Sequence, residues 1–179
     1  MKVLVLGGSG FVGKEFLMRQ ALEHGHELTY LSRNPGQGQL FESPRIKHLP
    51  GDILEVETLK TSKQFDVVVQ LIGAIDPRKL HAANVVAMEK AVWLCQKWSV
   101  QKMIYLSANV GYPSYVKSKQ TAENLLLASP VISVILRSGL IYGEERPATL
   151  WQARLLSSMK KIPIASYFAK KFQLSHLKW

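Results

Sequence analysis

The stretch KVLVLGGSGFVGKEF, residues 2–16, decides the fold. Residues 2–6 form a short apolar run that ends in glycine, which is typical of a buried parallel strand. Residues 11–23 then space their apolar side chains at helical intervals, and Gly25 supplies a stop signal. The sequence therefore predicts a strand, a glycine-rich loop and a helix at the start of the chain.

The chain up to residue 136 repeats this alternation of strands and helices. We predict further strands at 28–31, 46–49, 66–72, 103–106 and 131–136, and helices near 56–61, 81–98 and 115–128. Alternation with short loops predicts an α/β fold of Rossmann type, which is a doubly wound parallel sheet with helices on both faces. Residues 1–145 would form this domain and residues 146–179 a tail.

Composition places the chain among ordinary globular proteins. Of its 179 residues, 47% are hydrophobic and 20% are charged, and the formal net charge is +10. Residues 146–179 hold seven basic side chains and no acidic one, so most of the excess charge belongs to the tail. The single cysteine, Cys95, excludes a disulfide within the chain and is typical of a buried apolar position. The five histidines are scattered and indicate no metal site.

The glycine-rich loop at residues 7–13 (GGSGFVG) contains the pattern G-x-G-x-x-G between a strand and a helix. Its early glycines allow a tight turn, and its last glycine lets the helix pack closely on the strand. The helix N-terminus then offers N–H groups and a positive dipole end to a phosphate. The alternative is a purely structural turn. We predict that the pyrophosphate of a dinucleotide binds at Gly7, Gly10, Phe11, Val12 and Gly13.

The end of the second strand carries the residues that select the dinucleotide. Sites that prefer NAD place Asp or Glu there for the ribose hydroxyls, whereas this chain has Ser32 and Arg33. An arginine pairs with a 2′-phosphate, and a carboxylate repels it. We therefore expect NADP(H) to be favoured over NAD(H), with an exposed loop arginine as the alternative.

Three further positions are expected to contact the dinucleotide. Asp52 follows the third strand, where it could accept a hydrogen bond from the adenine amino group or cap the next helix. Ile53 lies beside it. Gly73 follows the fourth strand and would let the backbone pass close to the cofactor.

Tyr115 and Lys119 are four residues apart in a predicted helix, so they share a face. An ammonium near a phenol favours the phenolate and lowers the pKa of the phenol. Such a tyrosine can move a proton while a hydride moves to or from nicotinamide. Ser107 follows the fifth strand, at the carboxyl edge of the sheet where ligands bind.

Taken together, these motifs resemble the short-chain dehydrogenase/reductase superfamily, in its extended or atypical branch. That branch includes NAD-dependent epimerase/dehydratase-like and NmrA-like proteins. Besides the glycine loop, the matching stretches are Gly51-Asp52, Asn84 with its helix, Ser107-Ala108, residues 115–123 (YVKSKQTAE) and residues 136–143 (LRSGLIYG). The spacing is most similar to atypical members that include an accessory subunit of respiratory complex I and a coenzyme Q biosynthesis protein.

The resemblance implies roles for single residues. Tyr115 would be the acid/base, Lys119 would lower its pKa and bind ribose, and Ser107 would orient a substrate. Asn84 would help order the active-site water or helix. The sequence departs from the family pattern because the usual serine position falls on Ala108, the serine-to-tyrosine interval is eight residues, and Ser138 replaces a proline. Two hypotheses stay open. Either Tyr115 is catalytic, or Tyr115 and Lys119 are a retained pair that only binds ribose.

The tail is short for this superfamily, whose extended members continue into a substrate domain. Its apolar residues recur at helical spacing beside basic ones, which predicts two basic amphipathic helices separated by Pro163. These helices could pack over the sheet as a truncated lid, lie on an anionic membrane surface or dock on a protein partner. We expect no nucleic-acid binding, because no recognisable module accompanies the charge.

Three functions fit these observations. The first is an NADP(H)-dependent oxidoreductase or epimerase-like enzyme for a small carbonyl or sugar-nucleotide-like substrate. The second is a non-catalytic accessory subunit that holds NADP(H), and the third is a redox sensor. The chain opens directly on a strand, so we expect no targeting leader and a cytoplasmic location. The accessory-subunit hypothesis instead predicts the matrix face of the mitochondrial inner membrane.

Overall fold

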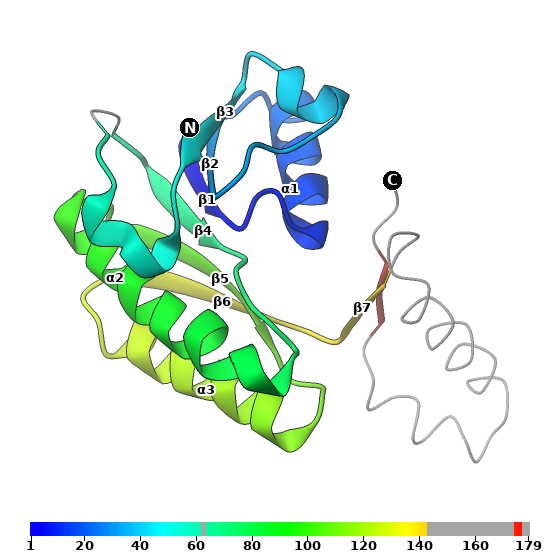
Figure 1. The fold of residues 1–179 in the computed structure, drawn as a ribbon, viewed down its shortest axis with the longest axis vertical. Coiled ribbons are helices and arrows are strands. Elements are labelled where there is room, and N and C mark those ends of the chain that lie inside the picture. Colours follow the sequence, from blue (N-terminus) through cyan, green and yellow to red (C-terminus); the bar gives the residue numbers. More distant parts are fainter. Residues whose placement is uncertain (62–63, 143–173, 177–179) are drawn as a thin grey trace, which may run out of the picture.

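A computed structural model of the chain describes residues 1–61, 64–142 and 174–176. Its main sheet has six strands in the order β3-β2-β1-β4-β5-β6, all paired in parallel (Figure 1). This order reverses between β1 and β4, so the predicted doubly wound Rossmann-type fold is confirmed. The strands are β1 (Lys2–Leu6), β2 (Glu27–Ser32), β3 (Ile46–Pro50), β4 (Val67–Gln70), β5 (Lys102–Ala108) and β6 (Ile132–Ser138).

Helices cover both faces of the sheet, as predicted. On one face α1 (Phe11–Leu22) and the 3₁₀ helix η1 (Gln39–Glu42) pack over Val3 and Val5 of β1. On the other face α2 (Ala87–Lys97) and α3 (Pro113–Leu127) pack over Leu4 and Leu6. Because side chains alternate along a strand, β1 is buried on both sides. Cys95 lies in the second core, where burial raises the pKa of its thiol to about 12, which confirms a buried apolar role.

Two predicted helices differ from the structure. The helix expected near 56–61 is a 3₁₀ helix, η2 (Ile53–Thr58), which begins earlier because the Asp52 carboxylate accepts a hydrogen bond from Leu54 N at 3.0 Å. The helix expected over 81–98 opens as a π-helix, η4 (His81–Val86), before it continues as α2. A short 3₁₀ turn, η3 (Pro77–Lys79), leads into it. Single π turns of this kind are frequent at functional sites.

The tail enters the structure only as a strand. β8 (Leu174–His176) pairs in parallel with β7 (Leu140–Tyr142), so the predicted helix is wrong for these three tail residues. The rest of the two predicted tail helices lies outside the described residues. Among the helices that the structure describes, none is long and apolar enough to cross a bilayer.

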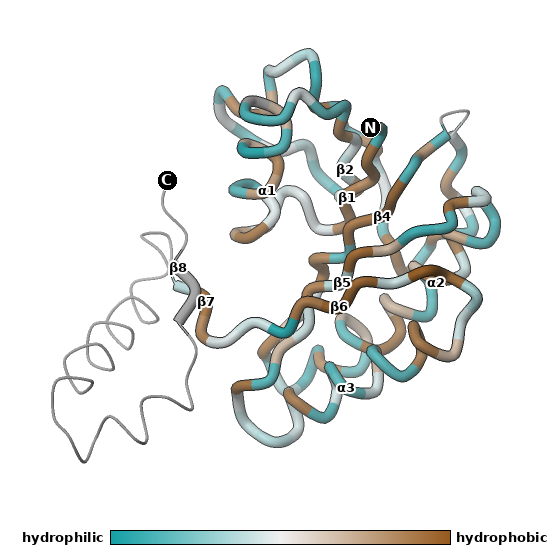
Figure 2. Tube along the Cα trace, turned by 180° about the vertical axis from the view of Figure 1, so that it is seen from behind, coloured by the Kyte–Doolittle hydropathy of each residue, from teal (hydrophilic) through white to brown (hydrophobic). Residues whose placement is uncertain are grey.

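The edge strand β6 exposes apolar side chains. Ile132, Val134 and Leu136 alternate along it and are 62%, 54% and 52% exposed. Figure 2 shows the hydrophobic strands that run through the sheet as far as β6. Parallel sheets are usually covered on both faces, and within the described residues this part of β6 stays open.

We expect Gly13→Ala to destabilise the fold. A Cβ at this position would lie 2.2 Å from the Gly7 carbonyl oxygen and 2.6 Å from Gly8 Cα. Alanine is favoured over glycine in a helix by about 1 kcal/mol, but overpacking against fixed backbone costs about 3 kcal/mol. Urea unfolding should therefore give a free energy of unfolding that is lower by about 2 kcal/mol.

Gly10→Ala is the matched control within the same loop. Gly10 has φ −79° and ψ 173°, which any residue adopts, and its Cβ would meet the Gly7 oxygen at 3.2 Å. Its free energy of unfolding should fall by less than about 1 kcal/mol. Equal losses in the two variants would contradict the close contact at Gly13.

Candidate functional site

A cavity of about 650 Å³ opens at the carboxyl edge of the sheet. Its walls come from the loops that follow β1, β2, β3 and β4, and from η4. Ligands of open α/β sheets bind at this edge, at the point where the strand order reverses. The predicted residues that line it are Gly7, Ser32, Arg33, Asp52 and Ile53.

The glycine loop forms one wall of this cavity. Gly7 has φ +87°, a conformation that favours glycine, and its carbonyl oxygen accepts a hydrogen bond from Gly10 N at 3.1 Å. Gly10 precedes α1, and in the structure as described no side chain caps this helix terminus. Phe11, Val12 and Gly13 form the first turn of α1 and do not line the cavity themselves. The helix N-terminus therefore lies beside the cavity wall, as the pyrophosphate prediction requires.

The end of β2 carries a charged pair. Arg33 has a side chain that is 80% exposed, and its Nε lies 3.8 Å from Asp52 Oδ2. Asp52 also caps η2, so the capping alternative is confirmed, and its contact with adenine stays a prediction. The Ser32 hydroxyl donates to the Asn34 carbonyl at 2.6 Å, which fixes the turn after β2.

Sequence reasoning missed two cationic side chains of the cavity. Lys14 and Lys79 line it together with Arg33, against the single carboxylate of Asp52. This excess of positive charge suits an anionic ligand. The position of Lys14 directly after the glycine loop was a readable signal. Lys79 comes from η3, and the path of that loop after β4 follows no sequence pattern.

A second group of predicted residues meets around Lys119. Its Nζ donates to the Leu106 carbonyl at 3.1 Å and lies 4.9 Å from the centre of the Tyr105 ring. A Cβ on Gly73 would lie 2.9 Å from this Nζ and 3.0 Å from Asn84 Oδ1, so the backbone passes close to both side chains here. Burial lowers the pKa of the Lys119 ammonium to about 8, and the nearby charge of Glu123 opposes this shift.

Asn84 ties three elements together from its place in the π-helix. Its amide oxygen accepts a hydrogen bond from Ala74 N at 3.0 Å. Its amide nitrogen donates to the Ala74 carbonyl at 3.0 Å and to Ser118 Oγ at 2.9 Å. Ser118 Oγ in turn donates to the Tyr115 carbonyl at 2.7 Å. The ordering role predicted for Asn84 therefore takes the form of a link between the β4 loop and the first turns of α3.

Tyr115 and Ser107 differ in their surroundings. Tyr115 is half-buried in the first turn of α3, with its ring 5.9 Å from that of Tyr112. Ser107 lies within β5, is 1% exposed, and its hydroxyl finds no partner at hydrogen-bond geometry among the described residues. A residue that orients a substrate needs an accessible hydroxyl. The burial of Ser107 therefore does not fit the role predicted for it.

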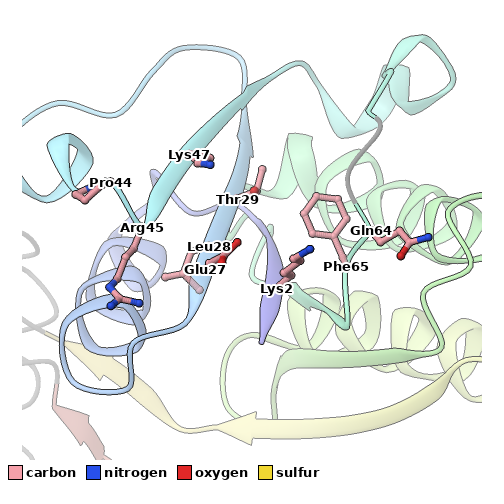
Figure 3. Close-up of a pocket in the computed structure, with 9 residues that line it drawn as sticks. All are labelled: Lys2, Glu27, Leu28, Thr29, Pro44, Arg45, Lys47, Gln64 and Phe65. Atoms are coloured by element: carbon pink, nitrogen blue, oxygen red, sulfur yellow. The ribbon is translucent and has the colours of Figure 1, made fainter.

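A second cavity, of about 710 Å³, lies at the opposite edge of the sheet (Figure 3). Its walls include Lys2, Thr29 and Lys47, near the amino ends of β1, β2 and β3, and the ring of Phe65. None of the predicted site residues lines it. Because ligands of this fold bind at the carboxyl ends of the strands, the first cavity is the candidate site.

The fold and the cleft define an α/β protein of Rossmann type with a dinucleotide-type glycine loop at its switch point. The chain belongs to the NAD dependent epimerase/dehydratase family, whose model matches residues 3–162. This confirms the epimerase/dehydratase part of the resemblance. The likeness to NmrA-like proteins and to the complex I accessory subunit stays a prediction.

Individual relatives are distant. An uncharacterized chloroplastic protein of Arabidopsis thaliana is 28% identical over 81% of this chain and 52% of its own length. A 3 beta-hydroxysteroid dehydrogenase/Delta 5-->4-isomerase of Mycobacterium tuberculosis is 25% identical over 84% of this chain and 47% of its own length. The solved structure of a UDP-galactose 4-epimerase matches with a TM-score of 0.69 and 17% identity, over 91% of this chain and 63% of that chain. The chain thus spans about half the length of these two curated relatives.

We expect Asn84→Ala to loosen the β4 loop. The substitution leaves the half-buried amide and carbonyl of Ala74 without their side-chain partner, which costs about 1–2 kcal/mol of unfolding free energy. Hydrogen exchange at the Ala74 amide should become faster. Asn109→Ala is the control, because Asn109 is exposed, and it should change the free energy of unfolding by less than about 0.5 kcal/mol. Unchanged exchange at Ala74 would contradict the link.

Proposed function

We propose that this chain binds NADP(H) and supplies the hydride-transfer half of an oxidoreductase or epimerase-like enzyme. The observation that carries the proposal is the glycine loop, whose close packing on β2 and on itself sets the N-terminus of α1 beside the cavity at the carboxyl edge. The substrate would be a small carbonyl or sugar-nucleotide-like molecule. The names of the relatives, a dehydrogenase/isomerase and an epimerase, support this class of reaction.

The residues present fit a dinucleotide. A Cβ on Gly8 would lie 2.5 Å from Tyr30 Cβ, and one on Gly13 would meet the loop backbone, so these two positions need glycine for the loop to pack this closely. The N-terminus of α1 beside it would hold the pyrophosphate, with Lys14 and Lys79 adding positive charge. When bound, the dinucleotide supplies a hydride donor or acceptor at its nicotinamide ring.

The preference for NADP(H) rests on the end of β2. The carboxyl end of β2, which is Leu31 and Ser32, carries no carboxylate for ribose hydroxyls, and Arg33 is exposed at the cavity wall. The Asp52 carboxylate lies near enough to compete with a 2′-phosphate for the guanidinium. The balance of these two charges sets the selectivity in our proposal.

We expect wild type to bind NADPH more tightly than NADH in a fluorescence titration. Arg33→Ala should weaken NADPH binding about tenfold and leave NADH binding nearly unchanged, because a charged hydrogen bond is worth about 1.5 kcal/mol or more. Asp52→Asn keeps a capping side chain and removes the charge, so it should increase the preference for NADPH. Tighter binding of NADH by wild type would overturn the proposed selectivity.

Catalysis is assigned to Tyr115 and Lys119. The Tyr115 hydroxyl would give or take the proton at the substrate oxygen, as a general acid or base. Lys119, one turn further along α3, would favour the phenolate through its charge and hold the nicotinamide ribose. We leave Ser107 out of the mechanism because its hydroxyl is buried.

A second candidate is a subunit or sensor that holds NADP(H) without catalysis. The buried Ser107, with Ala108 at the usual serine position, favours this alternative. The remaining part of a substrate site would lie in chain segments beyond those described or in a partner. The membrane surface and protein partner predicted for residues 146–179, and the predicted locations, stay predictions.

Tyr115→Phe separates these two candidates. For the enzyme, NADPH affinity should stay within about threefold, while NADPH oxidation with a panel of carbonyl substrates should fall by about a hundredfold or more, because proton transfer is lost. The measurements are a binding titration and the absorbance of NADPH at saturating cofactor. Binding with no oxidation by wild type across the panel would instead support the non-catalytic candidate.

A further inference from the structure

A buried ionic cluster lies behind Lys119 and is not used by the mechanism above. Lys119 and Glu123 sit on successive turns of α3, and each is only 4% exposed. Residues four apart on a helix share a face, so the two side chains leave α3 on the same side, the ammonium donating to the Leu106 carbonyl and the carboxylate accepting from Arg137. Burying two charges is costly unless they are paired and hydrogen-bonded. The cluster therefore needs an explanation beyond packing.

Arg137 on β6 clamps the carboxylate of Glu123. Arg137 Nε lies 3.0 Å from both carboxylate oxygens, and Nη2 donates to Oε2 at 2.6 Å. Burial raises the pKa of the Glu123 carboxyl, but the hydrogen bonds from Arg137 and the charges of Arg137 and Lys119 outweigh it, so the net direction is down. The carboxylate thus stays ionised while it is fixed in place.

The charge of Lys119 depends on this neighbour. Burial lowers the pKa of its ammonium to about 8, and Glu123 is the group that raises it. The other groups that face the pair are Tyr115 on α3, Tyr105 and Ser107 on β5, and Arg137 on β6, whereas η4 contributes the neutral amide of Asn84. Without the carboxylate, desolvation would act unopposed and lower the pKa of the ammonium further.

We propose that Glu123, clamped by Arg137, is a positioning residue for Lys119, and that its buried carboxylate keeps the ammonium charged and fixed beside Gly73 and the Leu106 carbonyl. The inference rests on the proposed role of Lys119 in the dinucleotide site. In that role a neutral lysine could neither favour the Tyr115 phenolate nor donate all three of its protons. Glu123 therefore sets the upper pH limit of the site while touching neither cofactor nor substrate.

The test is an NMR titration of Lys119 in the full chain without cofactor, using isotope-labelled lysine and Lys119→Met to assign the signal. In wild type the pKa should lie near 8. Glu123→Gln keeps the size of the side chain and removes its charge, so the acid dissociation constant of Lys119 should rise at least tenfold, which is one pKa unit or more. A shift below about a third of a unit would overturn the proposal.

Glu15→Gln is the matched control. Glu15 is a buried glutamate on α1 whose Oε1 pairs with Arg19 Nε at 2.5 Å, four residues along the same helix. The substitution removes the same charge from another buried glutamate, away from Lys119, and should leave the Lys119 titration unchanged. An equal shift in Glu15→Gln would show a general change of the fold and would overturn the specific role.

The reverse measurement keeps the proposal testable if Glu123→Gln fails to fold. Coupling between two sites is reciprocal, so Lys119→Met should raise the pKa of the Glu123 carboxyl by the same amount. The same pKa of the Glu123 carboxyl in wild type and in Lys119→Met would contradict the inference.

A binding measurement separates this inference from the proposed function. If Lys119 holds the ribose as an ammonium, NADPH affinity falls as pH rises through its pKa, and Glu123→Gln should move that fall at least one unit lower. If the pKa of Lys119 depends on Glu123 but the chain binds no NADPH, only the proposed function is overturned. If the chain binds NADPH but the pKa of Lys119 does not depend on Glu123, or the pH profile of binding is the same in Glu123→Gln, only the inference is overturned.

Discussion

The contact between the first turn of α1 and the glycine loop is the constraint on which the rest of the structure depends. Backbone meets backbone there, since a single Cβ on Gly13 would overlap the Gly7 oxygen. The helix therefore starts directly after β1 and presents its N-terminus at the carboxyl edge of the sheet. β1 is buried on both faces and pairs with β2 and β4, so its position fixes both halves of the fold.

The loop after β4 joins the two parts of the candidate site. Ile72 packs against Gly7 and lines the cavity. The next residue, Gly73, approaches Lys119 and Asn84. Two consecutive backbone positions thus connect the glycine loop with the proposed catalytic helix α3. Glu123 of α3 and Arg137 of β6 support Lys119 in the second part of the site, as hydrogen-bonded partners support a reacting group in many sites.

The sequence allowed the fold and the first part of the site to be predicted, because both follow from local patterns. An apolar strand, a glycine loop and the residue after a strand can be read within a few positions of one another. Long-range pairs could not be read: Arg137 clamps Glu123 across 14 residues and two elements, and Arg33 meets Asp52 only after β3 is placed. The π-helix at Asn84 could not be predicted, because one inserted residue barely changes the helical periodicity of the sequence. The strand at 174–176 could not be predicted either, because its pairing with β7 joins residues far apart in the sequence.

A crystal structure of the chain with NADPH would show directly whether the dinucleotide binds at the carboxyl edge of the sheet. We expect the pyrophosphate against the loop at residues 7–13, the 2′-phosphate beside Arg33, and the nicotinamide ribose within hydrogen-bond distance of Lys119 Nζ. A dinucleotide bound elsewhere, for example in the cavity at the amino ends of the strands, would contradict this expectation.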